Sequence, residues 1–565
     1  MLQPSYLYAK IFGGTKNIAV GETVSLEAEG SSSYYTVTGS WSVTGGSCYI
    51  SARSNRSCKV TGIKSGTSTV EWIGAINGSF YEMYWTINVT GSGGGSGGSG
   101  GNSKTPDTGF SDNWTSSGNY SISWYNNSKS EYHISTSKEL AGLAYLVNNG
   151  YTTFNGKVIK IDADIDLSGK NWVTIGDGQN YDFEGSFDGQ NHTISGIYIV
   201  SQHEKQQSYG FWAGLFKATY IKNIRLQGKV SIESNKTLTS GYMEHSWPGH
   251  SFIGGFVGFA NNVYFENCQC DMDVVCKRNH NNGYINLGGF AGQCRMNSSK
   301  DVAMKYCSHN GNLYASEWDS YSNPPRIGGL IGYSGITGGW DGVIEYCENN
   351  CSEIYCSQPY GNHSKSSNMY IGGLVGYGKP TIRYSRSIVE TIKIDQSSSA
   401  TMYFSIGGLG GDEVLLTNNY AIIKNLNVNS VTMNAGSGKV TFGGVASLKN
   451  SNSTANFSNS DININSSVSM SEGFHGAIFT SEQMKTNSFL EEINMYSQIN
   501  MGNSIWTPDE YGYPCISQVH SGTSSITSIQ RDDYLKDKVY NLFGRRLDKP
   551  SKGINIINGR KIIKK

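Results

Sequence analysis

Three aspartates at alternate positions of the stretch "KIDADIDLSG" are the first residues whose types and spacing could do chemistry. Asp162, Asp164 and Asp166 alternate with apolar residues, so a strand through this stretch places all three on one face. Carboxylate oxygens are ligands that Ca²⁺ prefers, which makes these residues the candidate metal site. Alternate side chains of one strand lie about 7 Å apart. Other loops must therefore complete a coordination shell, and the alternative is a solvated polar face.

A second acidic group has the residue types of a glycosidase acid/base pair: Asp182, Glu184 and Asp188. Nothing in its spacing selects that role over a solvated surface. The zinc-peptidase motif is absent, because His203-Glu204 is followed by "KQQ" and not by a second histidine one helical turn later. Nucleophile-elbow and Walker patterns are missing as well. We therefore expect no catalytic residues and no cofactor, with a polysaccharide-acting enzyme as the alternative.

Aromatic residues gather in the longest segments between the glycine motifs that recur after residue 252. Insertions in a repeat protein map to loops, and these often form its binding face. Aromatic rings on such loops can stack on sugars or on protein partners, or they can shield the edges of the strands. The candidate ligand-binding residues are Trp318, Tyr321, Tyr333, Trp340, Tyr355 and Tyr360.

The eleven cysteines lack the spacing of a zinc ribbon, since no CxxC is followed by a second CxxC or by paired histidines. Cys48 and Cys58 flank a ten-residue excursion, and either a disulfide closes it or both are buried thiols. The fourth positions of "FENC", "MKYC", "IEYC" and "IRYS" hold Cys268, Cys307, Cys347 and Ser385. We expect an interior row there, made either of packed thiols or of disulfides between neighbouring repeats.

The length and composition of the chain indicate the kind of fold that must position these side chains. A chain of 565 residues is too long for one compact domain. Its 44 basic and 44 acidic side chains cancel, which gives no reason to expect nucleic acid or an anionic membrane as the main partner. The 71 glycines, 36 tyrosines and only 10 prolines indicate an all-β, turn-rich, extracellular protein. No apolar run is long enough for a transmembrane helix.

Two adjacent glycines between apolar residues recur six times, as in "FIGGFVGFA" at 252 and "YIGGLVGYG" at 370. Successive motifs are separated by 34, 40, 44, 35 and 36 residues. Periods of this size indicate stacked repeats, and three strands of five or six residues with their turns fill one period. The pattern therefore predicts a parallel β-helix, or β-solenoid.

Stacking of the motifs predicts two apolar rows inside the solenoid. The first row holds the residues that lead each motif: Ile253, Leu287, Ile327, Ile371, Ile406 and Phe442. The second row holds the apolar residues three positions later: Phe256, Phe290, Leu330, Leu374, Leu409 and Val445. Strict strand alternation would put the two rows on opposite faces. We expect the glycines to form a bulge or sharp corner, helped by their tolerance of positive φ, so that both rows point inward.

The repeats have recognisable flanks. In "ISTSKELAGLAYLVNNG", Thr136 and Glu139 are spaced as a capping box and Gly150 can end a short helix, which would cap the first repeat. The all-Gly/Ser composition of "GSGGGSGGSGG" predicts a flexible linker over residues 91–104. Near the C-terminus, Asn558-Gly559 between "INII" and "RKII" predicts a tight hairpin.

Two parts of the sequence resemble known bacterial families. A strand with Trp41 followed by "VTGIKSGTSTV" resembles the bacterial immunoglobulin-like family, group 2, which implies a β-sandwich spacer or adhesion module over residues 1–90. The double-glycine motif resembles the GLUG repeat of bacterial surface proteins. The stretches "KIDADIDLSGKNWVTIG" and "NSIWTPDEYGYPCI" resemble the entry and exit segments of such repeats. These resemblances place a GLUG-repeat domain with both caps over residues 105–515.

The last segment, residues 516–565, resembles the C-terminal sorting domains of the Bacteroidetes type IX secretion system through "YNLFGRR" and "KGINIINGRK". That resemblance implies export across the outer membrane, followed by release or anchoring at the cell surface. The chain is then expected to be a secreted or surface-bound adhesin whose solenoid presents a binding face to a host glycan or an extracellular protein. Two alternatives stay open: a lyase or glycoside hydrolase on the same solenoid, and a structural surface-layer component.

Overall fold

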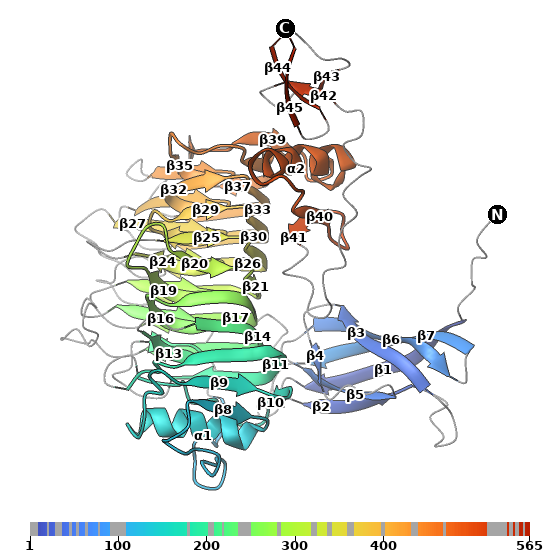
Figure 1. Ribbon diagram of the computed structural model, residues 1–565, viewed down its shortest axis with the longest axis vertical. Helices are drawn as coiled ribbons and strands as arrows, with labels where there is room; N and C mark the ends of the chain where they lie inside the picture. Colours follow the sequence, from blue (N-terminus) through green and yellow to red (C-terminus); the bar gives the residue numbers. More distant parts are fainter. Residues whose placement is uncertain are drawn as a thin grey trace.

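The computed structural model consists mostly of β-strands, with two α-helices among the residues that it describes (Figure 1). The described residues are 9–19, 22–28, 37–44, 48–51, 56–62, 66–76, 79–90, 109–177, 181–201, 208–216, 220–234, 250–278, 284–317, 325–335, 342–358, 367–396, 402–430, 439–466, 470–516, 539–541, 546–547, 553–557 and 560–564. The predicted all-β class is confirmed. Within these ranges, no helix combines the length and the apolar character needed to cross a membrane.

The N-terminal strands form two sheets around a hydrophobic core of their own. The four-stranded sheet has the order β1 (Ala9–Ala19), β7 (Ser79–Thr90), β6 (Gly66–Ile76) and β3 (Val37–Thr44). The three-stranded sheet has the order β2 (Thr23–Glu27), β5 (Ser57–Gly62) and β4 (Cys48–Ser51). Both sheets contribute to the core, because Val60 of β5 and Trp72 of β6 are fully buried in it.

Of the two alternatives for Cys48 and Cys58, the structure has the buried thiols and not the disulfide. Strand β4 pairs with β5 so that Cys48 lies opposite Gly62. Cys58 is four residues further along β5, about 13 Å away at the usual strand rise. A disulfide needs Cα atoms within about 7 Å. The two thiols instead lie in the apolar core, and burial raises the pKa of Cys48.

From residue 131 to residue 479 the chain builds one array of parallel strands in three stacks, with successive repeats lying one above another (Figure 1). The first stack contains β12 (Ser208–Tyr209), β15 (Ser251–Gly254), β18 (Ile285–Gly288), β23 (Arg326–Gly328), β27 (Ser367–Gly372), β31 (Met402–Gly407), β34 (Lys439–Gly443) and β38 (Met470–Glu472). The second stack contains β13 (Trp212–Leu215), β16 (Val257–Asn261), β19 (Ala291–Arg295), β24 (Ile331–Ser334), β28 (Val375–Tyr377), the start of β32 (Gly410–Thr417), and β35 (Ala446–Lys449).

The third stack is the longest and also contains the entry strands. Its members are β8 (Glu131–Ile134), β9 (Val158–Ile161), β10 (Ile165–Asp166), β11 (Ser186–Val200), β14 (Tyr220–Ser234), β17 (Tyr264–Arg278), β20 (Val302–Lys305), β21 (Ser308–Asn310), β22 (Leu313–Glu317), β25 (Val343–Glu345), β26 (Glu348–Gln358), β29 (Thr381–Arg383), the end of β32, β30 (Arg386–Gln396), β33 (Tyr420–Ser430), β36 (Phe457–Asn459), β37 (Asn463–Ser466) and β39 (Ala477–Phe479). Strands β11, β14 and β17 are each 15 residues long and pair in parallel.

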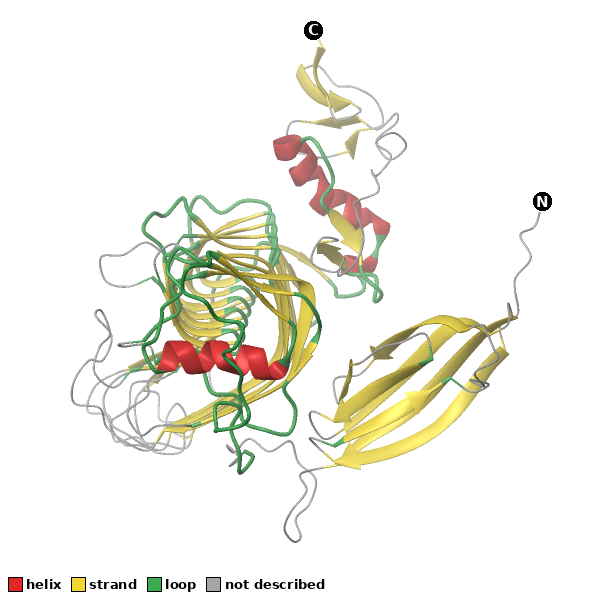
Figure 2. Cartoon of the chain, turned by 60° about the horizontal axis from the view of Figure 1, so that its bottom comes forward, coloured by secondary structure: helices red, strands yellow, loops and turns green. Residues whose placement is uncertain are grey.

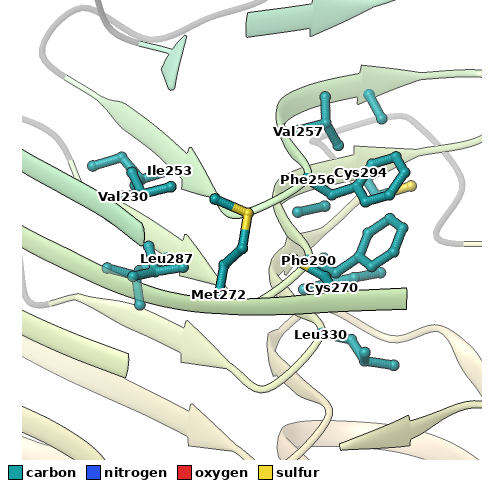
Figure 3. Packing of buried hydrophobic residues seen from close by; sticks show 14 of the residues in the cluster. Val230, Ile253, Phe256, Val257, Cys270, Met272, Leu287, Phe290, Cys294 and Leu330 are labelled. Atoms are coloured by element: carbon teal, nitrogen blue, oxygen red, sulfur yellow. The ribbon is translucent and has the colours of Figure 1, made fainter. Parts of the chain in front are cut away.

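Neighbouring repeats are in register at the residue that leads each glycine motif. Ile253 pairs with Leu287 and Leu287 pairs with Ile327, and the same pairing continues through the remaining three leading residues. All six side chains are buried. In the second predicted row, the rings of Phe256 and Phe290 stack with centroids 4.3 Å apart (Figure 3). Both predicted rows are therefore present and continuous.

The paired glycines of the motifs are required by close packing and not by a left-handed backbone, so the proposed use of positive φ is wrong: none of the paired glycines has φ above zero. A β-carbon on the first glycine of a pair would strike the carbonyl oxygen three residues later, as at Gly254 and Val257. On the second glycine it would strike a side chain from the opposite wall, as at Gly255 and Cys270 Sγ, 2.6 Å away. Each pair thus marks a tight turn against a filled interior.

One outward row of the third stack alternates in charge from repeat to repeat. Its members, paired in register, are Lys160, Asp188, Lys222, Glu266, Lys305, Glu345 and Arg383. Glu345 forms ion pairs with both neighbours, Lys305 Nζ at 3.5 Å and Arg383 Nη2 at 2.6 Å. Opposite charges that face each other on neighbouring strands stabilise the pairing, and like charges in the same places would destabilise it. The row therefore supports the order in which the repeats stack.

The first end of the array is capped by α1 (Ser137–Asn148), which lies across the end of the stacks (Figure 2). The predicted capping box is confirmed: Thr136 Oγ1 accepts a hydrogen bond from Glu139 N, and the Glu139 carboxylate accepts one from Thr136 N. Gly150 follows with φ of 70°. Leu140 and Leu143 of the helix are fully buried in the core of the array.

The exit segment comprises η2 (Gln483–Lys485), α2 (Asn487–Met501), β40 (Trp506–Pro508) and β41 (Pro514–Ile516). It packs on the last repeats through a separate apolar cluster that includes Phe457, Phe489 and Trp506. Two buried charges and one partly buried charge reinforce this contact: Arg386 pairs with the buried Glu348 at 3.0 Å and with the partly buried Asp509 at 2.7 Å.

A small antiparallel sheet lies near the C-terminus, formed by β43 (Arg546–Leu547), β42 (Val539–Asn541), β44 (Gly553–Ile557) and β45 (Arg560–Lys564). Ile557 pairs with Arg560, so two residues connect β44 to β45. These are Asn558 and Gly559, which lie outside the described residues together with the linker expected over residues 91–104.

Candidate functional site

The glycine turn brings two outward-facing rows of side chains together. One row holds the residue just before each leading residue, and the other holds the residue six positions after it. Within single repeats, the rings of Phe252 and Phe259 lie 5.7 Å apart, and those of Tyr370 and Tyr377 lie 4.5 Å apart. The angle between the first and second stacks is therefore lined by aromatic rings.

We call this cluster, of which Phe252, Phe259, His250 and Arg326 are buried and the remaining members half-buried, the aromatic corner. Its members are Phe216, His250, Phe252, Phe259, Tyr284, Arg326, Tyr333, Tyr370 and Tyr377. Every member contacts at least one other, through ring centroids no more than 6.1 Å apart or through the guanidinium of Arg326, and these contacts link all nine residues. The corner thus runs without interruption across successive repeats.

Arg326 is the one member of the aromatic corner that carries a permanent positive charge near neutral pH. Its guanidinium carbon lies 3.7 Å from the ring centroid of Tyr284, 4.6 Å from that of Tyr333 and 4.4 Å from that of Tyr377. Cation–π attraction of this kind is strongest where water is excluded, and Arg326 is 9% exposed. Burial lowers its pKa from the usual arginine value. Among the described residues, no carboxylate forms an ion pair with it.

Two polar donors at Arg326 have no acceptor among the described residues. They are Arg326 Nε and the amide nitrogen of Asn286, a residue that pairs with Arg326 in the first stack. The Asn286 oxygen accepts a long hydrogen bond of 3.5 Å from Arg326 Nη1. The side-chain amide of Gln293, in contrast, has an acceptor, because its Nε2 donates to the carbonyl oxygen of Gly335 at 2.6 Å. The site therefore offers more donors than the described chain uses.

The structure places the two described aromatic candidates in separate clusters. Tyr333 belongs to the aromatic corner, whereas Tyr355 lies in the third stack beside Tyr314 and 5.5 Å from Lys393 Nζ. The other candidates lie outside the described residues: Trp318, Tyr321, Trp340 and Tyr360. The six residues therefore do not form one site in the part of the chain that the structure describes.

The three aspartates of the candidate calcium site do not converge. Asp162 accepts hydrogen bonds from His133 Nδ1 at 2.9 Å and from Gln190 Nε2 at 2.7 Å. Asp164 binds the backbone N–H of Thr193, and Asp166 accepts one from Ser168 N. The hydrogen bond from His133 lowers the pKa of Asp162. No group of three metal-ligating side chains occurs among the described residues, so these residues do not assemble the candidate calcium site.

The second acidic group is also divided among different partners. Glu184 accepts a hydrogen bond from Thr153 Oγ1 at 3.0 Å. Asp188 pairs with Lys222 at 3.3 Å and belongs to the alternating charge row. Its pKa is lowered by the hydrogen bonds from Asn223, Gln190 and Lys222, against an opposing effect of burial. These contacts give both carboxylates structural roles.

The predicted cysteine row consists of packed thiols. Cys268, Cys307 and Cys347 immediately precede residues that pair in register, and all three are buried. Each thiol donates to a backbone carbonyl, for example Cys347 Sγ to Glu345 O at 3.2 Å. Ser385 continues the row, and its hydroxyl accepts a hydrogen bond from Cys347 N at 3.0 Å. All eleven cysteines lie in described ranges and none forms a disulfide.

Comparison with known proteins adds no assignment: no family model, no curated protein and no solved structure matches the chain. The candidate site is therefore argued from its own geometry.

Most residues of the aromatic corner are not among those predicted from the sequence, although the motifs contain a signal for them. Aligned on their leading residues, "FIGGFVGF", "RIGGLIGY" and "YIGGLVGY" carry an aromatic or arginine before the leading residue and an aromatic at the end.

Proposed function

We propose that this chain is an adhesin-like binding protein that works in the extracellular space or at a bacterial cell surface. In this proposal the parallel array is a β-solenoid of the GLUG-repeat kind. Its N-terminal sheets are an immunoglobulin-like spacer, and its C-terminal strands belong to a sorting domain of the type IX system. Support for the solenoid comes from the in-register pairing of Ile253, Leu287 and Ile327 and from the helix α1 that covers its first end.

The observation that carries the binding role is the aromatic corner. Tyrosine combines a large contact surface with a polar hydroxyl, and it is enriched where proteins bind partners. Tyr284, Tyr333, Tyr370 and Tyr377 are all half-buried, so each keeps part of its surface on the outside. A binding protein with host glycans or extracellular matrix proteins as ligands makes direct use of such a surface. The polysaccharide-acting enzyme has no observation of its own in its favour.

A binding screen with the purified full-length chain tests this proposal. We expect binding to at least one member of a panel of glycans and matrix proteins, measured by biolayer interferometry. Tyr377→Ala in the aromatic corner should weaken that binding, whereas Tyr355→Ala in the third stack should leave it unchanged. A chain that folds normally and binds nothing on the panel would contradict the proposal.

A further inference from the structure

The unmatched donors at Arg326 point to a missing acceptor. A buried N–H without an acceptor costs about 1–3 kcal/mol, and more for a charged group, so native proteins leave few of them. Here the amide of Asn286 and Nε of Arg326 are both unmatched and belong to paired residues of adjacent repeats. Both are donors, and one carries a positive charge. A group rich in acceptors and negative in charge satisfies them together.

The shape of the site narrows the chemistry of that group. Three tyrosine rings lie within 4.6 Å of the guanidinium carbon, Nη1 already donates to Asn286, and Nε is the buried donor that stays unmatched at the edge of the guanidinium. That edge is a planar fork that matches the two oxygens of a carboxylate, or two oxygens of a sulfate. The same rings offer faces on which a sugar ring can stack.

We propose that Arg326 and Asn286 form an anion-binding subsite in the aromatic corner, and that it takes the carboxylate or sulfate group of an acidic glycan. This inference rests on the proposed binding function and names its ligand class. The tyrosines on either side, Tyr284 and Tyr370, extend the contact into the preceding and following repeats. A linear glycan lying along the array meets one set of rings per repeat, about every 4.8 Å.

An acidic peptide fits this surface less well. Extended peptides gain much of their affinity by adding a strand to an open sheet edge. Strand β23, which carries Arg326, is already paired with β18 on one side and with β27 on the other. The backbone of the first stack therefore offers no edge at this repeat, and recognition must come from side chains.

Asn286→Asp is the sharpest test, because it supplies the missing anion from within the protein. The substitution keeps the size of the side chain and places a carboxylate next to Arg326 Nη1. We expect a higher melting temperature and a loss of acidic-glycan affinity of at least about tenfold, the usual worth of one charged hydrogen bond. Arg326→Met should lose the affinity to a similar extent. Asn465→Asp on an exposed position of the third stack, where the paired residue is Asn427, is the control and should change neither quantity.

Calorimetry with five probes separates the outcomes: oligogalacturonate, its methyl ester, dextran sulfate, unmodified dextran and polyglutamate. Binding of oligogalacturonate or dextran sulfate, but not of the uncharged forms, and its loss in Asn286→Asp support the subsite and identify the anion. Neutral-glycan binding that Asn286→Asp leaves intact overturns the subsite while the binding function stands. Binding of polyglutamate alone overturns the glycan assignment. A chain that binds none of these probes and nothing on the wider panel overturns both proposals.

Discussion

Gly444 and Ser458 face each other across the interior of one repeat, and a β-carbon on the glycine would lie 2.6 Å from Cβ of the serine. The preceding repeat has a different obstacle. There a β-carbon on Gly408 would strike the backbone carbonyl of Gly444 as well as Cβ of Ala421, 2.5 Å away. The second glycine of the motif is thus required by a side chain, which a substitution can remove, at Gly444 and by fixed backbone one repeat earlier, at Gly408.

This contrast predicts which glycine substitution can be rescued. Gly444→Ala and Gly408→Ala should each lower the free energy of unfolding by about 2 kcal/mol, because extra atoms in a packed interior force neighbours apart. Ser458→Gly should restore part of the loss caused by Gly444→Ala, whereas Ala421→Gly should restore little of the loss caused by Gly408→Ala. Urea unfolding of both double-mutant cycles measures the two coupling energies. Equal coupling in the two cycles would show that the side chains are not what separates them.

The alternating charge row predicts a strong effect at Glu345, which is 8% exposed in its side chain between two basic residues. Glu345→Lys would place three like charges in adjacent repeats and should lower the free energy of unfolding by about 2 kcal/mol, more than an exposed pair contributes. The loss should shrink as salt rises, because salt screens the repulsion. Glu345→Gln should cost less. Melting temperatures of the three proteins at low and high ionic strength test this, and a salt-independent loss would argue for a packing defect instead.

The interior rows could be predicted from the sequence because a fixed motif at a fixed place in each period specifies its own neighbours. Ile253 and Leu287 could be paired without knowing the loop between them. The capping box at Thr136 was readable for a similar reason, since its partners are three residues apart. Local spacing and strict repetition were the two kinds of information that transferred directly into structure.

The aromatic corner and the partners of the aspartates could not be predicted in the same way. Arg326 meets Tyr377 from the next repeat only because the glycine turn folds the two stacks toward each other, and that angle is not a feature of the spacing. The histidine partner of Asp162 is not visible in the spacing of the aspartates, because His133 lies 29 residues earlier on a different strand. The packing that requires the second glycine of each pair could not be predicted either, because the side chains that face it come from the opposite wall.

The buried charges under the exit segment predict that its docking depends on Arg386. This side chain is 2% exposed and pairs with Glu348, which is fully buried, and with Asp509. Arg386→Met would remove the cation that both carboxylates share and should cost about 3–5 kcal/mol. Hydrogen exchange should then rise in α2 and β40 before it rises in the interior rows. The double variant Arg386→Met/Glu348→Leu should recover much of the loss, because no fully buried charge is left alone.

Lys424→Met is the control for this experiment. Lys424 pairs with Glu390 at 2.6 Å, but both side chains are about half exposed, and such pairs contribute at most about 1 kcal/mol. We expect little change in the hydrogen exchange of the exit segment in this variant. Equal losses in Arg386→Met and Lys424→Met would contradict the proposed difference between the buried and exposed pairs.

His309 predicts a pH dependence of the array. It is fully buried opposite Gly289, with Nδ1 2.9 Å from Asn349 Oδ1 and Nε2 3.0 Å from Met272 O. Burial lowers its pKa, although those hydrogen bonds and the nearby carboxylates of Asp271 and Asp273 act in the opposite direction. The folded state therefore binds the proton less well than the unfolded state does. Its stability is complete above the ordinary histidine pKa of about 6.5 and falls as the pH drops below that value.

The variant His309→Asn isolates this contribution, because the next repeat already places an asparagine, Asn349, at the paired position. The unfolding free energies of both proteins, plotted against pH from 5 to 8, should have the same slope above about pH 6.5 and different slopes below it. There the wild type should lose up to about 1.4 kcal/mol more per pH unit than the variant. Other histidines, including the exposed His133 whose pKa is raised by Asp162, contribute equally to both proteins and cancel in the difference. Parallel curves across the whole range would mean that His309 keeps an ordinary pKa despite its burial.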